Sequence, residues 1–292
     1  MNIKDLQYYI SLTQLKKFSE VAQKFHVSQP TISAAIQRLE AEVGSRLIIR
    51  DNPHLPLKLT TSGEQTLIHG QNILREYQLL QQEIAHNEAG QLVIGMPPII
   101  EITYFPRVAS RLPQELFKQI QPISQGSLAA LAGLKNGQLD LAFLGYLDDF
   151  TDSSISLHEF DQQPFSIVVP QNHPLAQKKS ISFQTLRNQN FIVLKNNFVH
   201  RQAFQRITRI NHMRPNIIFE SNEIQSVLNM VAHQMGIALL SNSVILDNPN
   251  LVRIPLNDTN LPTFKVGLAY RTSMKFSPGQ TKLLNAIKTA FN

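Results

Sequence analysis

The feature that most constrains the fold is a pair of short helical repeats near the amino end, joined by a segment with room only for a turn. The first repeat follows one helix face, with i, i+3, i+4, i+7 spacing, at Phe18, Val21, Ala22 and Phe25. After residues 26–27, Ser28 supplies an oxygen to cap a second helix, and Pro30 suits its first turn. Gly44 is placed to end that helix. Together with an amphipathic helix over residues 3–15, the pair predicts a helix-turn-helix.

The second helix of the pair carries short hydrogen-bonding side chains on the face that its apolar residues leave exposed. Such groups suit base edges and phosphates when a helix lies in the major groove of DNA, whereas a purely solvated face more often carries Glu–Lys pairs. The DNA-contact candidates on this helix are Gln29, Pro30, Thr31, Ser33, Gln37 and Arg38. A helical hairpin within an enzyme has the same spacing, so the pattern alone leaves both interpretations open.

The segment after this helix has the pattern of a β-hairpin. Residues 46–50 are rich in β-forming side chains, residues 51–56 have turn chemistry, and residues 57–60 suit a returning strand. A hairpin in this place is the wing of a winged helix. Arg50 and Lys58 are then expected along the DNA backbone, where phosphate contacts are sensitive to salt.

These residues together resemble the LysR-type transcriptional regulators. The resemblance runs in order and without gaps through residues 18–33 and 36–40, then Gly44, Leu47, Arg50 and residues 59–63. It implies a winged helix-turn-helix head that binds DNA sequence-specifically, and a second domain that responds to a small-molecule effector. The chain departs from the family pattern at Ile48, where phenylalanine is usual. It departs again at Ala34, where many members carry arginine or another polar residue.

A long linker helix is predicted next, since residues 61–88 contain no proline and Thr61 and Glu64 have capping-box spacing. Its apolar stripe consists of Leu67, Leu74, Tyr77, Leu80 and Ile84. The stripe must be buried, either on the chain's own carboxy-terminal part or, as the resemblance implies, against the same helix of a second copy. Such a dimer suits a dyad-symmetric operator, because its two recognition helices lie about 34 Å apart. The resemblance further implies a tetramer, and residues 87–91 are expected as a hinge.

The remaining two-thirds of the chain alternates strand and helix patterns, which predicts α/β architecture with a parallel sheet. The predicted strands are 92–95, 139–144, 165–169, 191–194, 217–220, 236–240 and 265–270. Residues 136–142, 173–175 and 235–240 resemble recurring phrases of the LysR effector module, which implies two lobes like those of type 2 periplasmic binding proteins. The expected domains are a head over 1–61, a linker over 62–89 and an effector domain over 90–292. Lobe I is expected at about 90–161 and 265–292, and lobe II at about 162–264.

An effector site is expected where strands of the two lobes end, because helix N-termini present free N–H groups there and favour anions. The candidates are Pro98, Ile99, Gly126, Ser127, Tyr146, Lys195, Asn197, Phe198, Arg201 and Ser221. Each residue has an alternative role as an ordinary cap or turn. Residues 2–9 and 60–65 resemble the regulators of malolactic fermentation within the family, which implies malate or a similar carboxylate as effector.

Composition and absent motifs argue against the other function classes. The chain has no cysteine, no close pair of metal-binding histidines, no nucleophile elbow and no phosphate-binding glycine loop, so neither an enzyme, a metal site nor a cofactor is expected. A net charge of +6 allows an anionic partner. With neither a signal-like start nor a run of about 20 apolar residues, a cytoplasmic protein without membrane contact is expected, with RNA polymerase as a further partner. Two alternatives stay open: a small-molecule binder with only non-specific nucleic-acid contacts, and an α/β hydrolase or transferase.

Overall fold

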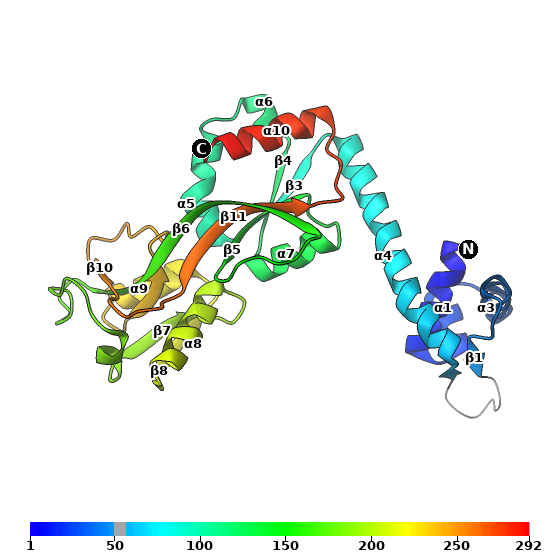
Figure 1. The fold of residues 1–292 in the computed structure, drawn as a ribbon, viewed down its shortest axis with the longest axis horizontal. Helices are drawn as coiled ribbons and strands as arrows, with labels where there is room; N and C mark the ends of the chain where they lie inside the picture. Colours follow the sequence, from blue (N-terminus) through cyan, green and yellow to red (C-terminus); the bar gives the residue numbers. More distant parts are fainter. Residues whose placement is uncertain (50–56, 292) are drawn as a thin grey trace. The chain divides into compact units, whose positions relative to one another are not determined.

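The structure is a computed structural model that describes residues 1–49 and 57–291 (Figure 1). It divides into two compact units, Met1–Gln82 and Glu83–Asn292. Helix α4 (Thr61–Ala89) begins in the first unit and ends in the second.

The first unit is a three-helix core followed by two short strands. Its elements are α1 (Ile3–Leu15), α2 (Phe18–Lys24), α3 (Gln29–Val43), β1 (Ile48–Ile49) and β2 (Lys58–Leu59). The predicted caps of α3 are confirmed: the Ser28 hydroxyl accepts a hydrogen bond from the Thr31 N–H at 3.3 Å, and Gly44 ends the helix at φ +74°. Leu6, Ile32 and Ile36 are fully buried where the helices meet, so the apolar faces read from the sequence do form one core.

The two strands pair antiparallel, with Ile48 opposite Leu59, as a hairpin requires. The predicted turn at 51–56 and the predicted phosphate contact Arg50 lie outside the described residues. The predicted capping box at Thr61 is wrong. Thr60 caps α4 instead, because its Oγ1 accepts from the Gly63 N–H at 2.9 Å.

The second unit places helices on both faces of a mixed sheet. Its first elements are β3 (Leu92–Met96), α5 (Pro98–Ala109), α6 (Gln114–Phe117), β4 (Ile120–Ser124), α7 (Ser127–Lys135), β5 (Leu141–Tyr146), β6 (Ile155–Pro170) and the 3-10 helix η1 (Phe183–Leu186). The others are β7 (Asn190–Leu194), α8 (Val199–Ile210), β8 (Asn216–Ser221), α9 (Ile224–Ala232), β9 (Ala238–Ser241), β10 (Leu251–Pro255), β11 (Thr263–Arg271) and α10 (Pro278–Thr289).

Strand β6 joins two lobes. The sheet order is β10-β6-β11-β5-β3-β4, with β9 also pairing β6, and β7 and β8 form a separate pair. Residues 155–164 of β6 pair with β11, whereas residues 165–170 pair with β9 and β10. We call the part built on β3, β4, β5 and β11 lobe I, and the part built on β7 to β10 lobe II. Figure 1 shows β6 and β11 running side by side.

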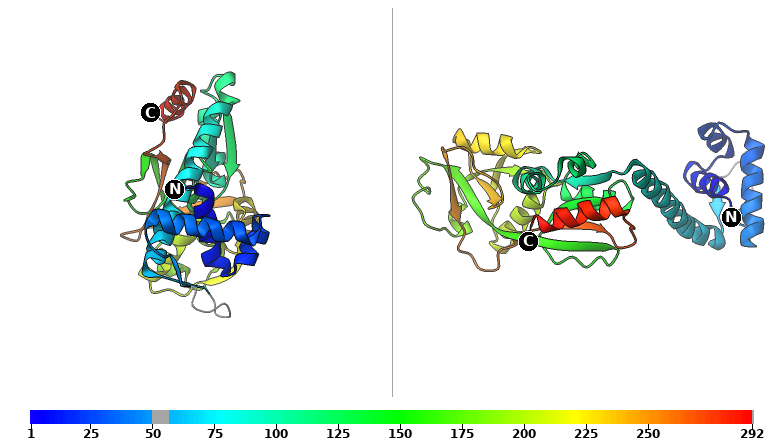
Figure 2. Two further views of the ribbon diagram at one scale, coloured as in Figure 1. Left: turned by 90° about the vertical axis from the view of Figure 1, so that its right-hand side faces the viewer. Right: turned by 90° about the horizontal axis from the view of Figure 1, so that it is seen from above.

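The expectation of a parallel sheet is only partly right. Strands β3, β4 and β5 are parallel, as are β7 and β8, but β6 and β11 run antiparallel to their neighbours. Helix α10 packs its apolar side against lobe I on the face that Phe143 and Leu268 also share (Figure 2). On the other face α7 packs against Ala142 and Leu144.

Candidate nucleic-acid interface and effector site

The first turn of α3 forms an exposed polar surface on the packed head. Gln29, Pro30 and Thr31 are exposed, as are Gln37 and Arg38 further along the helix. Ser33 is half-buried, so it is less accessible than the sequence pattern suggested. On β2, Lys58 is exposed. The roles of these side chains in DNA contact stay predictions.

Arg38 has a structural partner that the sequence analysis missed. Its Nε and Nη2 donate to the two carboxylate oxygens of Asp5 at 2.9 and 2.7 Å, and Asp5 is buried. This bidentate pair ties α3 to α1 across 33 residues of sequence. Asp5 is buried among apolar residues of α1, and the ion pair with Arg38 explains why a carboxylate occupies that position.

A second missed contact fixes the hairpin to the recognition helix. The Glu40 carboxylate, on the last turns of α3, accepts hydrogen bonds from the backbone N–H groups of Leu47 at 2.8 Å and Ile48 at 3.3 Å. The start of β1 is therefore set by a side chain of α3. The sequence signal was available, since Glu40 lies in the run that resembles the LysR family.

Five of the ten effector candidates gather around one small cavity between the lobes. We call it the interlobe cleft; its volume is about 20 Å³. The candidates that line it are Ile99, Gly126, Ser127, Asn197 and Phe198. Pro97, Ile100, Val199, His200 and Phe264 line it as well. The lobes touch here, because a Cβ added at Gly126 would lie 3.0 Å from the Asn197 carbonyl oxygen.

Three helices begin at the interlobe cleft. Pro97, Gly126 and Phe198 are the N-cap residues of α5, α7 and α8, all three line the cleft, and none makes a side-chain capping hydrogen bond. Uncapped first-turn N–H groups and the helix dipoles favour an anion at such a place. The cleft thus combines anion-binding backbone with mostly apolar side chains.

Ser127 does not cap α7, contrary to the prediction. Gly126 is the N-cap residue, and the Ser127 hydroxyl instead accepts from the Gly145 N–H at 2.9 Å, which pins the start of α7 to the end of β5. The prediction failed because the capping pattern does not distinguish the last non-helical residue from the first helical one.

The other effector candidates do not line the interlobe cleft. Pro98 starts α5, and Lys195 is exposed. Tyr146 donates its hydroxyl proton to Glu159 at 2.6 Å, Arg201 pairs with Glu220 at 2.8 Å, and the Ser221 hydroxyl accepts from the Glu223 N–H at 3.0 Å. Their roles in ligand binding stay predictions.

His200 is a buried residue that lines the cleft. Its Nε2 lies 2.9 Å from the Ser241 hydroxyl, which lies 2.5 Å from that of Ser243. The ring packs against Phe165 and Phe264. Burial lowers the pKa of His200 to about 3, so the imidazole is neutral at physiological pH.

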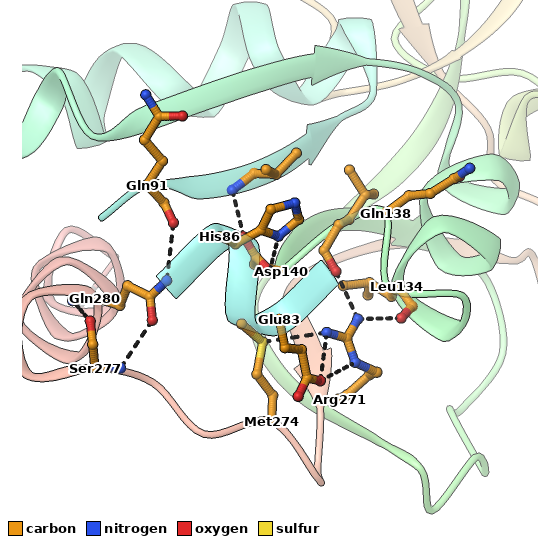
Figure 3. Close-up of polar contacts among 12 residues, drawn as sticks. Glu83, His86, Gln91, Leu134, Gln138, Asp140, Arg271, Met274, Ser277 and Gln280 are labelled. Atoms are coloured by element: carbon orange, nitrogen blue, oxygen red, sulfur yellow. Dashed lines mark hydrogen bonds and ion pairs between the residues drawn. The ribbon is translucent and has the colours of Figure 1, made fainter. Parts of the chain in front are cut away.

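The end of α4 is bound to lobe I by buried polar contacts (Figure 3). Arg271 of β11 is 4% exposed and donates to the carbonyls of Leu134 and Leu139, and to the Glu83 carboxylate at 3.1 Å. Figure 3 shows its guanidinium between Glu83 and the end of α7. Sequence analysis did not find Arg271, because its partners are far away along the chain.

A second contact holds the next turn of α4. The His86 ring Nδ1 lies 2.8 Å from the Asp140 carboxylate, which also accepts from the Val93 N–H at 2.8 Å. The predicted hinge at 87–91 is helical up to Ala89, and the Gln91 carbonyl accepts from Gln280 of α10 at 3.0 Å. The last turns of the linker are therefore held in the second unit (Figure 3).

Neither a metal-binding cluster nor a membrane-spanning helix is present in the described residues. Within residues 1–49 and 57–291, no cluster of three or more His, Cys, Asp or Glu side chains is arranged to hold a metal ion. In the same part of the chain, no helix combines the length and apolar character needed to cross a membrane.

Comparisons with known proteins agree with this architecture. Residues 3–64 match the model of the bacterial regulatory helix-turn-helix proteins of the lysR family, and residues 85–292 match the LysR substrate binding domain. The malolactic fermentation system transcriptional activator of Lactococcus lactis subsp. lactis is 30% identical, with 99% of each chain covered. The dual regulator OxyR of Escherichia coli is 26% identical, over 99% of this chain and 95% of its own.

Solved structures show the same fold. HinK, a LysR family transcriptional regulator from Pseudomonas aeruginosa, has a TM-score of 0.59 at 22% identity and covers 100% of this chain and 98% of its own. The effector-binding domain of QuiR in complex with shikimate has a TM-score of 0.59 at 20% identity, over 68% of this chain and 96% of its own. The chain belongs to the LysR family of transcriptional regulators.

Proposed function

We propose that this LysR-family regulator reads a dyad-symmetric operator with the first turn of α3, while Arg50 and Lys58 of a wing contact phosphates. The observation that carries the proposal is the exposed polar turn at residues 29–31, on a head whose helices bury their apolar faces in one core. In this proposal residues 1–61 are the head, 62–89 the linker and 90–292 the effector domain. The protein acts in the cytoplasm, performs no catalytic step, and contacts RNA polymerase at its promoter.

Replacing both Gln29 and Thr31 with alanine is expected to weaken operator binding by about thirtyfold or more, since each of the two base contacts contributes about 1–3 kcal/mol of discrimination. Footprinting of the parent is expected to give a bounded site with inverted symmetry. The matched control is Gln114→Ala, an exposed glutamine of α6. Parent-like affinity and selectivity of the double variant would refute the proposal, as would uniform, salt-labile coverage by the parent.

The proposed dimer forms through apolar side chains of α4 that stay exposed in the single chain. Leu67 and Leu74 of the predicted stripe pack against the head's own core, but Leu80 is 53% and Ile84 48% exposed. Ile73, Tyr77, Leu80 and Ile84 follow the 4-3-4 spacing of a helix–helix seam. A second copy of α4 supplies the matching surface, and two such dimers form the tetramer.

Ile73→Glu combined with Leu80→Glu is expected to convert the dimer to monomers, because like charges would meet in the seam. Sedimentation velocity measures the change, with Gln78→Glu on the adjacent exposed face as control. The side chains of Ile73 and Leu80 are exposed in the single chain, so circular dichroism is expected to stay unchanged. If the double variant sediments as the parent does, the seam lies elsewhere.

The proposed effector is a small carboxylate such as malate, held at the interlobe cleft. The uncapped starts of α5, α7 and α8 support an anion there, and relatives act in malolactic fermentation or were solved with shikimate. Because a cavity of about 20 Å³ has room for about one water, the lobes must separate to admit such a ligand. A ligand that binds only the separated lobes shifts the population toward that arrangement, and so changes the spacing of the heads.

A further inference from the structure

A second and much larger cavity lies further along helix α5, beyond the residues that line the interlobe cleft. Its volume is about 530 Å³, within the range of small-molecule sites. It lies where α5, β6, residues 242–246 and β10 meet, and we call it the α5–β10 pocket. It shares no lining residue with the interlobe cleft. We propose that the α5–β10 pocket binds a small organic carboxylate with an apolar body, as a second ligand site of this regulator.

The charges of the lining favour an anion. It contains two guanidinium groups, Arg107 and Arg253, and one carboxylate, Asp161. That carboxylate already accepts from the Tyr104 hydroxyl at 2.6 Å and from Gln163 Nε2 at 3.0 Å. Among residues 1–49 and 57–291, no carboxylate lies within ion-pair distance of either arginine. Two guanidinium groups against one carboxylate leave the lining with a net positive charge, and neither arginine is held in an ion pair within the described part of the chain.

The guanidinium of Arg253 is held in place by backbone carbonyls, not by a carboxylate. Its Nη1 donates to the Asn242 carbonyl at 2.9 Å and its Nη2 to the Val244 carbonyl at 2.5 Å. Its Nε is buried and makes no hydrogen bond within the described residues. Carbonyl oxygens orient a guanidinium without cancelling its charge, and a partly buried cation is most stable when an anion lies beside it.

The rest of the lining sets the shape of the ligand. Arg107, on the last turn of α5, is exposed and has no side-chain partner within the described residues, so it is free to close over a carboxylate. Val244 and Ile245 supply an apolar wall opposite α5. A guanidinium pair with an apolar wall matches an aromatic or aliphatic acid rather than a bare inorganic anion.

This pocket also connects the two lobes. Thr103 of α5 donates its hydroxyl to the Ser243 carbonyl at 2.8 Å, so one wall comes from lobe I and the other follows β9 of lobe II. The Ser243 hydroxyl continues through Ser241 to His200, which lines the interlobe cleft. A carboxylate between Arg107 and Arg253 binds tightly in only one arrangement of the lobes, so its occupancy changes how readily the cleft opens.

The test is calorimetric titration of the full-length chain with phenylacetate, and with phenylacetamide as an uncharged probe of the same shape. We expect saturable binding of phenylacetate alone, at constant ionic strength. Arg107→Gln is expected to weaken binding about tenfold or more, and Ile245→Trp, at a 46% exposed position, to weaken it by narrowing the pocket. Arg209→Gln, an exposed arginine of α8, is the matched control and is expected to bind as the parent does.

Three results would overturn the proposal. The first is a parent chain that binds no phenylacetate, or binds the amide equally well. The second is unchanged affinity in both Arg107→Gln and Ile245→Trp. The third is a loss of phenylacetate binding in Asn197→Asp alone. That variant adds a negative charge beside the interlobe cleft, so such a result would mean that phenylacetate binds there. That third result would leave the proposed effector site standing and remove only the second site.

Discussion

Replacing Gly63 with alanine is expected to unfold the amino-terminal unit and abolish operator binding, with a loss of about 3 kcal/mol or more in the free energy of unfolding. A Cβ at Gly63 would lie 2.1 Å from the Leu47 carbonyl oxygen and 3.0 Å from the Tyr9 hydroxyl. The first of these is a backbone atom, so no rotamer change relieves the clash. The hairpin would have to leave its place beside α4.

The same substitution disturbs a buried hydrogen bond. The Tyr9 hydroxyl donates to the Gly63 carbonyl at 2.7 Å. Burial, helped by the nearby carboxylates of Glu40 and Glu64, raises the pKa of Tyr9 to about 12, so the phenol keeps its proton at neutral pH. A shift of α4 would leave this donor and acceptor unpaired.

Hydrogen-exchange mass spectrometry separates the effects on the two units. In Gly63→Ala we expect loss of protection in α1 to α3 and unchanged protection in β3 to β11. The control is Gly279→Ala in the first turn of α10, where an added Cβ meets nothing within 4 Å, so stability is expected to change by less than about 0.5 kcal/mol. Parent-like protection of the head in Gly63→Ala would contradict this prediction and show that the backbone at Leu47 can make room for a Cβ.

Arg271→Ala is expected to lower the free energy of unfolding of the second unit by about 3–5 kcal/mol, the usual cost of breaking a buried ion pair. The truncation leaves the carbonyls of Leu134 and Leu139 without this donor, and leaves the Glu83 carboxylate beside an empty volume. Because Glu83 lies on α4, the last turns of the linker are expected to lose protection from exchange before the sheet does.

Urea unfolding monitored by circular dichroism measures the loss, with Arg209→Ala as the control for removing an exposed arginine. Arg271→Lys keeps the charge but not the planar fork, so an intermediate loss is expected. If Arg271→Ala unfolds at the parent's urea concentration, the attachment of α4 depends on His86 and Asp140 instead.

The helical head was largely predictable because its determinants are local. The spacing of apolar residues, the Ser28 cap and the Gly44 terminus each involve residues within four positions of one another, and all three are present in the structure. The fold class of the second unit followed in the same way from strand and helix alternation.

Strands were missed where their side chains do not alternate. Strand β4 was not predicted, because it lies at the sheet edge with Gln121 and Pro122 exposed, and only its pairing with β3 identifies it. The first half of β6 contains His158, Glu159 and Asp161 and resembles a loop. Pairing with β11 makes it a strand, and that partner is about a hundred residues away.

The sequence by itself determined the three-helix head and the family, because the caps and amphipathic faces of the head are encoded by near neighbours. Only the tertiary structure decided that Arg38 binds Asp5, that Arg271 binds the end of α4, and that Arg107 and Arg253 line one pocket. Those contacts join residues far apart along the chain. Their energy comes from burial and charge pairing, and neither exists until the backbone has folded.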